Sequence, residues 1–364
     1  MKMWSRIAGF LASLLVTCAS SGAALAQTGA SPTPIEGDFI IHDFHFHSGE
    51  TLPELRIHYT TFGHPVRDAA GHVTNAVIAM HGTGGSGTSL IRPIFSGVLF
   101  SPGGLLDASR YYIILPDDIG HGKSSKPSDG LRARFPHYDY ADMVEAEHRL
   151  VTEGLQVDRL RLVMGTSMGC MHTFLWGEIW PDMMDALMPL ACLDVPIAGR
   201  NRLWRQMVVD AITSDPAWKG GDYTAEPREA LRAAADLITI AGGAPLQMQK
   251  SLPTPEAAEK YLDDRLHAEF ATEDANDILY STDSSRDYDA SHLELIKAPV
   301  MWINSADDFI NPPELGIAER EVKRIAHARF VLIPISDQTW GHGTHTHAAV
   351  WKDYLAELLR ESAR

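Results

Sequence analysis

The sequence has 364 residues, of which 45% are hydrophobic and 21% charged, as is typical of a globular protein. The length suits one large domain with an insertion or two smaller domains. Its formal net charge of −16 argues against nucleic acid and anionic membranes as partners.

The first 26 residues have the pattern of a secretory signal peptide. Lys2 and Arg6 precede an apolar run that is too short to span a bilayer, and Ala24 and Ala26 occupy the small-residue positions of a cleavage site. We expect cleavage after Ala26, a periplasmic or secreted protein, and no membrane span in the mature chain.

Short apolar runs then alternate with helical patterns. Residues 39–48 and 55–63 alternate polar and apolar side chains, as half-exposed strands do. Continuous apolar runs suit parallel strands covered on both faces, and they fall at 76–80, 111–116, 160–165, 186–192, 299–304 and 329–335. Helical patterns fall at 139–155, 171–180 and 346–362. This alternation predicts an α/β fold with a mostly parallel, doubly wound sheet.

One long segment breaks the alternation. Residues 197–296 contain helical patterns and no convincing buried strand. We expect a helical lid there, over the sheet edge where α/β proteins bind ligands. The lid divides the predicted core into residues 27–196 and 297–364.

The strongest chemical signal is a G-x-S-x-G motif built from Gly165, Ser167 and Gly169. It directly follows an apolar strand pattern and precedes a helical one. A nucleophile elbow needs that context, because a tight turn projects the serine and glycines avoid clashes. The motif predicts Ser167 as a nucleophile, which requires a base oriented by an acid.

The acid is expected beyond the strand at 299–304, where two aspartates follow one another. In α/β hydrolases the chain order is serine, acid, histidine. We prefer Asp308, which lies four residues before Pro312, and keep Asp307 as the alternative.

The base is expected in the loop after the last strand, within the stretch "TWGHGTHTHA". His342 is the best candidate because it lies in that loop, just ahead of the closing helix, and His345 is the alternative. Two backbone N–H groups should stabilise the oxyanion, and we assign them to Met168 and, in the "HGTGG" loop, to Thr83.

Two patterns suggest cofactors and are set aside. The glycines of the "HGTGG" loop resemble a dinucleotide fingerprint, but no helical pattern opens behind them. The H-x-H pairs at 45–47 and 345–347 resemble zinc ligands, yet strand alternation explains the first and the second lacks the acid and histidine that should follow. We expect no cofactor and no metal.

The cysteines allow two interpretations. Cys18 belongs to the signal peptide, which leaves Cys170 and Cys192 in apolar surroundings. Buried thiols are the default for such a pair, and a single disulfide stays open in an oxidising compartment.

Several segments resemble the homoserine O-acetyltransferase family of the α/β-hydrolase superfamily. They are "YTTFG", "NAVIAMHGTGG", "FPHYDYADMV", "GTSMGCM" and the lid segment "AITSDPAWKGGDY", and they span most of the mature sequence. The resemblance implies an α/β-hydrolase fold and triad roles for Ser167, Asp308 and His342. The lid of this family often mediates dimers, so a homodimer through the lid is an open alternative.

Departures from that family bear on the acyl acceptor. The aspartate that typically follows the family's catalytic histidine is replaced by Gly343, and "PDDIGHGKSSKP" is closer to ordinary hydrolases. Export also removes the protein from cytosolic acetyl-CoA. We therefore expect an exported serine hydrolase that cleaves a small carboxylic ester, with amide or lactone as variants. An O-acyltransferase with the same triad is the alternative, and a metal-dependent hydrolase or a non-catalytic binding module would be of another class.

Overall fold

The computed structural model describes residues 33–268 and 273–363. The predicted signal peptide, residues 1–26, lies outside this range, so its cleavage and the export of the chain stay predictions. Within the range, no helix has both the length and the apolar character needed to cross a bilayer.

The described residues form an eight-stranded sheet in the order β1-β2-β4-β3-β5-β6-β7-β8. The strands are β1 (Ile35–His45), β2 (Thr51–Phe62), β3 (Ala76–Met80), β4 (Tyr112–Pro116), β5 (Leu162–Thr166), β6 (Leu187–Leu190), β7 (Val300–Ser305) and β8 (Ala328–Ile333). The first two strands form an antiparallel edge, and every pair from β4 to β8 is parallel. The predicted α/β fold with a mostly parallel sheet is confirmed.

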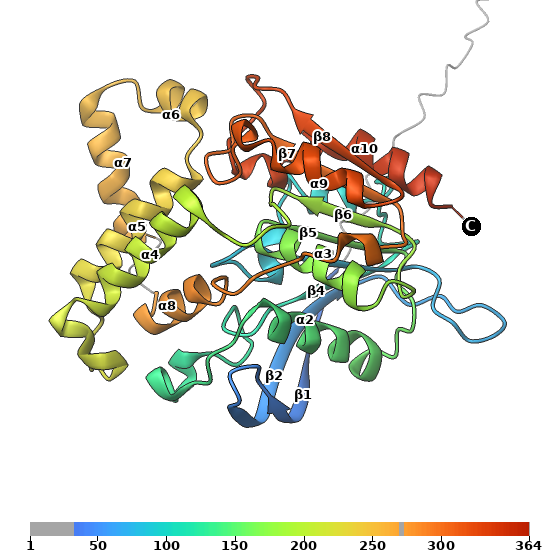
Figure 1. Ribbon diagram of the computed structural model, residues 1–364, viewed down its shortest axis with the longest axis horizontal. Coiled ribbons are helices and arrows are strands. Elements are labelled where there is room, and N and C mark those ends of the chain that lie inside the picture. The colour runs from blue at the N-terminus through green and yellow to red at the C-terminus, as the bar shows by residue number, and fades with distance from the viewer. Residues whose placement is uncertain (1–32, 269–272, 364) are drawn as a thin grey trace, which may run out of the picture. The chain divides into compact units, whose positions relative to one another are not determined.

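Helices cover both faces of this sheet (Figure 1). On one face Ile78 of β3 packs in the same core as Phe174, and on the other Val77 packs in a core with Trp351. This explains the continuous apolar strands, because neighbouring side chains of each strand enter different cores. The covering helices are α1 (Ser96–Leu99), α2 (Tyr140–Arg149), α3 (Met168–Ile179), α9 (Ile317–Glu321) and α10 (Ala348–Glu361).

The order of the strands creates the point where a site can form. After β3 the chain crosses to β4 on one side and then returns to β5 on the other. The loops that leave the carboxyl ends of β3 and β5 therefore diverge and leave a crevice, which is where open α/β sheets bind ligands.

Five α-helices lie between β6 and β7, and no strand occurs there among the described residues. They gather on one side of the sheet in Figure 1, as a helical lid is expected to do. They are α4 (Gly199–Thr213), α5 (Arg228–Gly242), α6 (Pro245–Ser251), α7 (Pro255–Ala268) and α8 (Ala275–Asp283).

Two hydrogen bonds hold the two ends of this lid together. The Ala290 N–H donates to the carbonyl of Asp194 at 3.1 Å, and the Tyr288 hydroxyl donates to the carbonyl of Leu193 at 3.2 Å.

The Asp194 side chain is itself buried, and neither of its oxygens has a hydrogen-bond partner in the described part of the chain. Burial raises the pKa of this carboxyl to about 7.

We predict that Asp194 makes the protein less stable as pH rises. The unfolded chain ionises this carboxyl near pH ~4, so between about 4 and about 7 only the unfolded state releases the proton, and the free energy of unfolding falls. Asp194→Asn should raise it by up to about 4 kcal/mol at pH ~8 and leave it nearly unchanged at pH ~4. Denaturant titrations at both pH values measure this, with the exposed Asp222→Asn as control; an equal effect at both pH values would contradict it.

Candidate active site

The backbone of Ser167 forms a sharp turn between β5 and α3. Its φ of 55° and ψ of −107° lie outside the common regions for a non-glycine residue. The flanking glycines are required sterically, since a Cβ on Gly165 would lie 2.0 Å from the carbonyl oxygen of Gly169, and one on Gly169 2.5 Å from that of Met80. The turn is therefore a nucleophile elbow of the predicted kind.

Ser167, His342 and Asp308 form one hydrogen-bonded chain. His342 Nε2 lies 2.8 Å from Ser167 Oγ, and its Nδ1 lies 2.8 Å from Asp308 Oδ2. An ionised carboxylate only accepts, so we assign the imidazole proton to Nδ1, which leaves the Nε2 lone pair for the serine hydroxyl. The structure thus brings together the three residues, from the loops after β5, β7 and β8, that the sequence assigns to a triad.

The Asp308 carboxylate is fully buried and well supplied with donors. Besides His342, it accepts hydrogen bonds from the Ile310 N–H at 2.8 Å, the Asn311 N–H at 3.2 Å and the Asn311 side-chain amide at 3.0 Å. Burial by itself would raise the pKa of Asp308, but the charge of His342 and these hydrogen bonds hold it below its usual range.

Asn311 is a supporting residue that sequence reasoning missed. Its side-chain amide also donates to the carbonyl of Ala191 at 3.0 Å, which ties the acid loop to the end of β6. In the sequence it stands in "DFINPP", where an asparagine before prolines indicates only a turn.

The two alternative residues take other positions. Asp307 accepts hydrogen bonds from Ser305 Oγ and from the Gly341 N–H, the latter at 3.0 Å, so it holds the histidine loop instead of the imidazole. His345 is half-buried, with its ring at 72° to that of His342 and 5.0 Å away, and desolvation lowers its pKa to about 3. Neither alternative lies in the relay. His347 stacks on Trp340.

The loop after β3 lies directly against the serine. A Cβ on Gly82 would be 3.2 Å from the Cβ of Ser167, so the next residue, Thr83, lies in the loop that borders the nucleophile. Met168 is the first residue of α3, where backbone N–H groups have no partner within the helix. Their oxyanion roles stay predictions. The Thr83 hydroxyl, which sequence reasoning overlooked, is buried and has no hydrogen-bond partner among the described residues.

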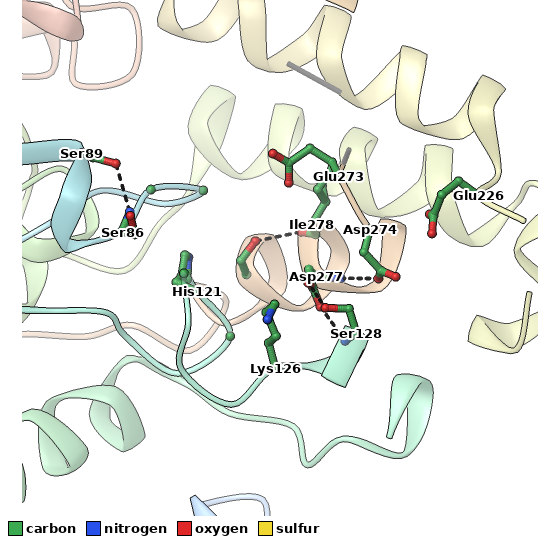
Figure 2. Close-up of a pocket in the computed structure, with 15 residues that line it drawn as sticks. Ser86, Ser89, His121, Lys126, Ser128, Glu226, Glu273, Asp274, Asp277 and Ile278 are labelled. Atoms are coloured by element: carbon green, nitrogen blue, oxygen red, sulfur yellow. Dashed lines mark hydrogen bonds between the residues drawn. The ribbon is translucent and has the colours of Figure 1, made fainter. Parts of the chain in front are cut away.

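A cavity of about 580 Å³ opens beside this loop (Figure 2). The loop contributes Gly84, Gly85 and Ser86, and the segment after β4 contributes His121 and Lys126. The lid side of the cavity is acidic and carries Glu226, Glu273, Asp274 and Asp277. Such a wall favours polar or cationic groups on a ligand that enters from this side.

A second cavity, of about 450 Å³, is lined by apolar side chains such as Met171, Leu193, Val195 and Ile310.

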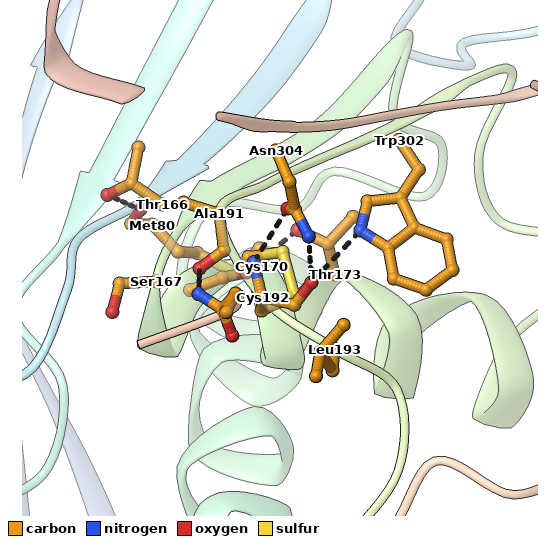
Figure 3. The surroundings of a disulfide bond; sticks show 12 residues. Met80, Thr166, Ser167, Cys170, Thr173, Ala191, Cys192, Leu193, Trp302 and Asn304 are labelled. Atoms are coloured by element: carbon orange, nitrogen blue, oxygen red, sulfur yellow. Dashed lines mark hydrogen bonds between the residues drawn. A yellow bond between two sulfur atoms is a disulfide. The ribbon is translucent and has the colours of Figure 1, made fainter. Parts of the chain in front are cut away.

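Cys170 and Cys192 form a disulfide, with Cα atoms 5.8 Å apart, so the default of two buried thiols is wrong (Figure 3). Because β5 pairs with β6, the end of β6 lies beside the first turn of α3, and the two cysteines meet. The carbonyl of Cys192 also accepts hydrogen bonds from the side chains of Trp302 and Asn304. The bond ties the helix that follows Ser167 to the segment that leads into the lid.

This fold and site define an α/β hydrolase. Residues 75–337 match the family described as the alpha/beta hydrolase fold, and the chain belongs to that family. Among curated proteins it is 30% identical to a "Probable acyltransferase" of Methanothermobacter thermautotrophicus over 76% of this chain and 84% of the relative. It is 29% identical to a homoserine O-acetyltransferase of Moorella thermoacetica over 88% of this chain and 95% of the relative.

Solved structures show the same fold at lower identity. A homoserine O-acetyltransferase from Bacillus anthracis superimposes with a TM-score of 0.78 at 20% identity, over 90% of this chain and 97% of that one. An acetylester hydrolase from Corynebacterium glutamicum superimposes with a TM-score of 0.77 at 21% identity, over 90% and 96%. The predicted resemblance to the homoserine O-acetyltransferases is confirmed, and the chain is an enzyme of the α/β-hydrolase family.

The two neighbouring aspartates should differ sharply on substitution. Asp308→Asn removes the acceptor that fixes the His342 tautomer, and we expect turnover of an activated ester to fall by about 10⁴. Asp307→Asn should keep most of the turnover, because its amide oxygen still accepts from the Gly341 N–H. Steady-state kinetics on 4-nitrophenyl acetate compares the two, and a larger loss from Asp307→Asn would contradict the assignment.

The disulfide should contribute measurably to stability. The cysteines are 22 residues apart, and closing a loop of that length constrains the unfolded chain by about 3 kcal/mol. A reductant should lower the free energy of unfolding of the parent by about this amount. The double variant Cys170→Ala/Cys192→Ala should be insensitive to reductant. Guanidinium titrations with and without dithiothreitol test this, and a parent that reductant does not destabilise would contradict it.

Proposed function

We propose that the protein is a serine acyltransferase that carries the acyl group on Ser167 and passes it to a small acceptor. The observation that carries this proposal is the continuous hydrogen-bond relay from Ser167 Oγ through His342 to Asp308, at 2.8 Å for each step. The names of the curated relatives favour acyl transfer over the ester hydrolysis that the sequence analysis preferred.

The geometry accounts for both halves of the reaction. Ser167 Oγ attacks the donor carbonyl while His342 Nε2 takes its proton, and the imidazolium then protonates the leaving group. Backbone N–H groups at Thr83 and Met168 stabilise the negative charge on the carbonyl oxygen. In the second half His342 removes a proton from the acceptor, which attacks the acyl-enzyme and releases Ser167.

Ester hydrolysis, with water as the acceptor, is the second candidate, and specific features support it. Gly343 follows the triad histidine at the position where the acetyltransferases have an aspartate. A Cβ on Gly343 would contact the Cβ of Trp340 at 3.7 Å, an ordinary distance, so the structure has room for a side chain that this sequence lacks. The sequence at 1–26 is typical of an export signal, and the Cys170–Cys192 bond suits an oxidising compartment. Export would separate the enzyme from cytosolic acyl-CoA.

A homodimer through the lid belongs to the same proposal. Leu203 and Met207 lie one turn apart on α4 and are 60% and 50% exposed. An apolar pair on the outside of the lid suits contact with a second copy.

The acceptor decides between transfer and hydrolysis. With a 4-nitrophenyl ester as donor, a transferase should release nitrophenolate faster as the concentration of hydroxyl or amine acceptors rises, and acylated acceptor should exceed free acid. A hydrolase should yield free acid at a rate independent of the acceptor. Product ratios from mass spectrometry across acyl-CoA and ester donors with amino-acid and alcohol acceptors distinguish them.

Both candidates require the serine. Ser167→Ala and His342→Gln should each lower turnover by about 10⁴–10⁶, whatever the acceptor. The matched control is His347→Gln, which changes a histidine in the same loop that stacks on Trp340 outside the relay. If Ser167→Ala kept the parent rate, the acyl-enzyme mechanism would be wrong for both acceptors.

A further inference from the structure

A cluster of ionisable side chains lies buried beneath the elbow and takes no part in the relay. Asp118 follows β4, Glu147 belongs to α2, His172 to α3, and His81 directly follows β3. Each is at most 2% exposed. Atoms of Asp118, Glu147 and His172 that could bind a metal ion all lie within 4.8 Å of one another.

The spacing of these atoms suits a shared metal ion. Asp118 Oδ2 lies 3.8 Å from His172 Nδ1. Ligand atoms of a tetrahedral ion with bonds of 2.0–2.2 Å are roughly 3.3–3.6 Å apart. Glu147 Oε1 and His172 Nδ1 are closer, at 2.8 Å, and would separate by less than an ångström.

Asp118 is the member that most needs a partner. Neither of its carboxylate oxygens accepts a hydrogen bond from an N–H or hydroxyl donor among the described residues. The residue is buried, faces both histidines and lies within hydrogen-bonding reach of the Glu147 carboxyl. Two adjacent carboxyl groups in a protein core must be neutralised by protons or by a cation.

Surrounding groups orient the cluster as they would metal ligands. His81 Nδ1 lies 2.9 Å from the carbonyl oxygen of Gly82, which favours the tautomer with a lone pair on Nε2. That lone pair accepts the Asp118 N–H at 3.2 Å, which holds the backbone of Asp118 beside the cluster. Glu147 Oε2 accepts the Trp176 indole N–H at 2.7 Å, so Oε1 is the oxygen that faces the cluster.

We propose that Asp118, Glu147 and His172 bind one divalent transition-metal ion. An imidazole and two carboxylates are ligands that Zn²⁺ accepts, and the charges of a dication and two carboxylates cancel in the core. All three ligands are buried and none belongs to the relay, so the ion is structural and does not touch the substrate. The site was missed in the sequence because its residues are spread from 118 to 172 with no metal-ligand spacing.

Such an ion would hold together the elements that frame Ser167. Asp118 follows β4, Glu147 lies in α2, and His172 lies in the helix that begins just after the serine. The ion would therefore link α3 to α2 and to the segment after β4.

Refolding tests this, since such buried ligands would take up the ion during folding. The mature protein is unfolded in guanidinium chloride with a chelator, refolded with chelator or with Zn²⁺, and dialysed. Metal content is measured by plasma mass spectrometry and the unfolding midpoint by thermal scan. We expect one zinc per chain and a higher midpoint after refolding with Zn²⁺.

Two variants locate the ion. Asp118→Asn/Glu147→Gln places two amides that can hydrogen-bond to each other, and it should bind no zinc and show no zinc-dependent midpoint. His47→Gln disrupts a separate, more exposed cluster with Asp139 and Asp142 and should keep the ion. Loss of the zinc in His47→Gln would place the ion at that cluster and overturn the proposal.

If the parent protein refolds without zinc to the same midpoint and retains no zinc, the carboxyl groups share a proton instead, and the proposal is wrong. The parent protein alone decides this last point, so misfolding of the double variant would not protect the proposal.

Discussion

The strained turn at Ser167 is the constraint on which the rest of the site depends. A non-glycine residue at a φ of 55° costs on the order of 1–3 kcal/mol and persists only where the surroundings enforce it. Here the Ser167 N–H donates to the carbonyl of Leu190 at 2.9 Å, and the Gly169 N–H donates to that of His81. Neighbouring strands therefore hold the turn from both sides, and the hydroxyl is presented to His342 without further adjustment.

The same neighbourhood joins the nucleophile to the lid. Cys170 lies three residues after Ser167, and its disulfide reaches the segment through which the chain enters the lid. Asn311 connects that region to the acid loop, since its amide contacts both Asp308 and the carbonyl of Ala191. Covalent and hydrogen bonds therefore fix Ser167, Asp308 and the start of the lid relative to one another. His342 joins the loop of Ser167 to the loop of Asp308 through its two hydrogen bonds.

Both proposed reactions, acyl transfer and hydrolysis, would use this arrangement equally. In either one the relay would remove a proton from whichever nucleophile approaches the acyl-enzyme, so it carries no information about the acceptor. Selection must come from the groups around the acyl-enzyme: the acidic cavity beside the loop after β3, the apolar cavity beside α3 and the space beside Gly343. This explains how proteins named as transferases and as ester hydrolases share the fold at similar TM-scores.

Sequence patterns alone were enough to predict the fold class and the serine of the relay. Both depend on local patterns: apolar strands that alternate with helices, and a strand, glycines and a helix around Ser167. The sequence narrowed the acid and the base to two candidates each. Adjacent residues in a loop point in different directions, and only the packed loops show that Asp308 faces His342 while Asp307 faces Gly341. The disulfide, the role of Asn311 and the buried cluster at Asp118 were decided by tertiary structure alone, because residues far apart in the chain become neighbours only when the strands pair.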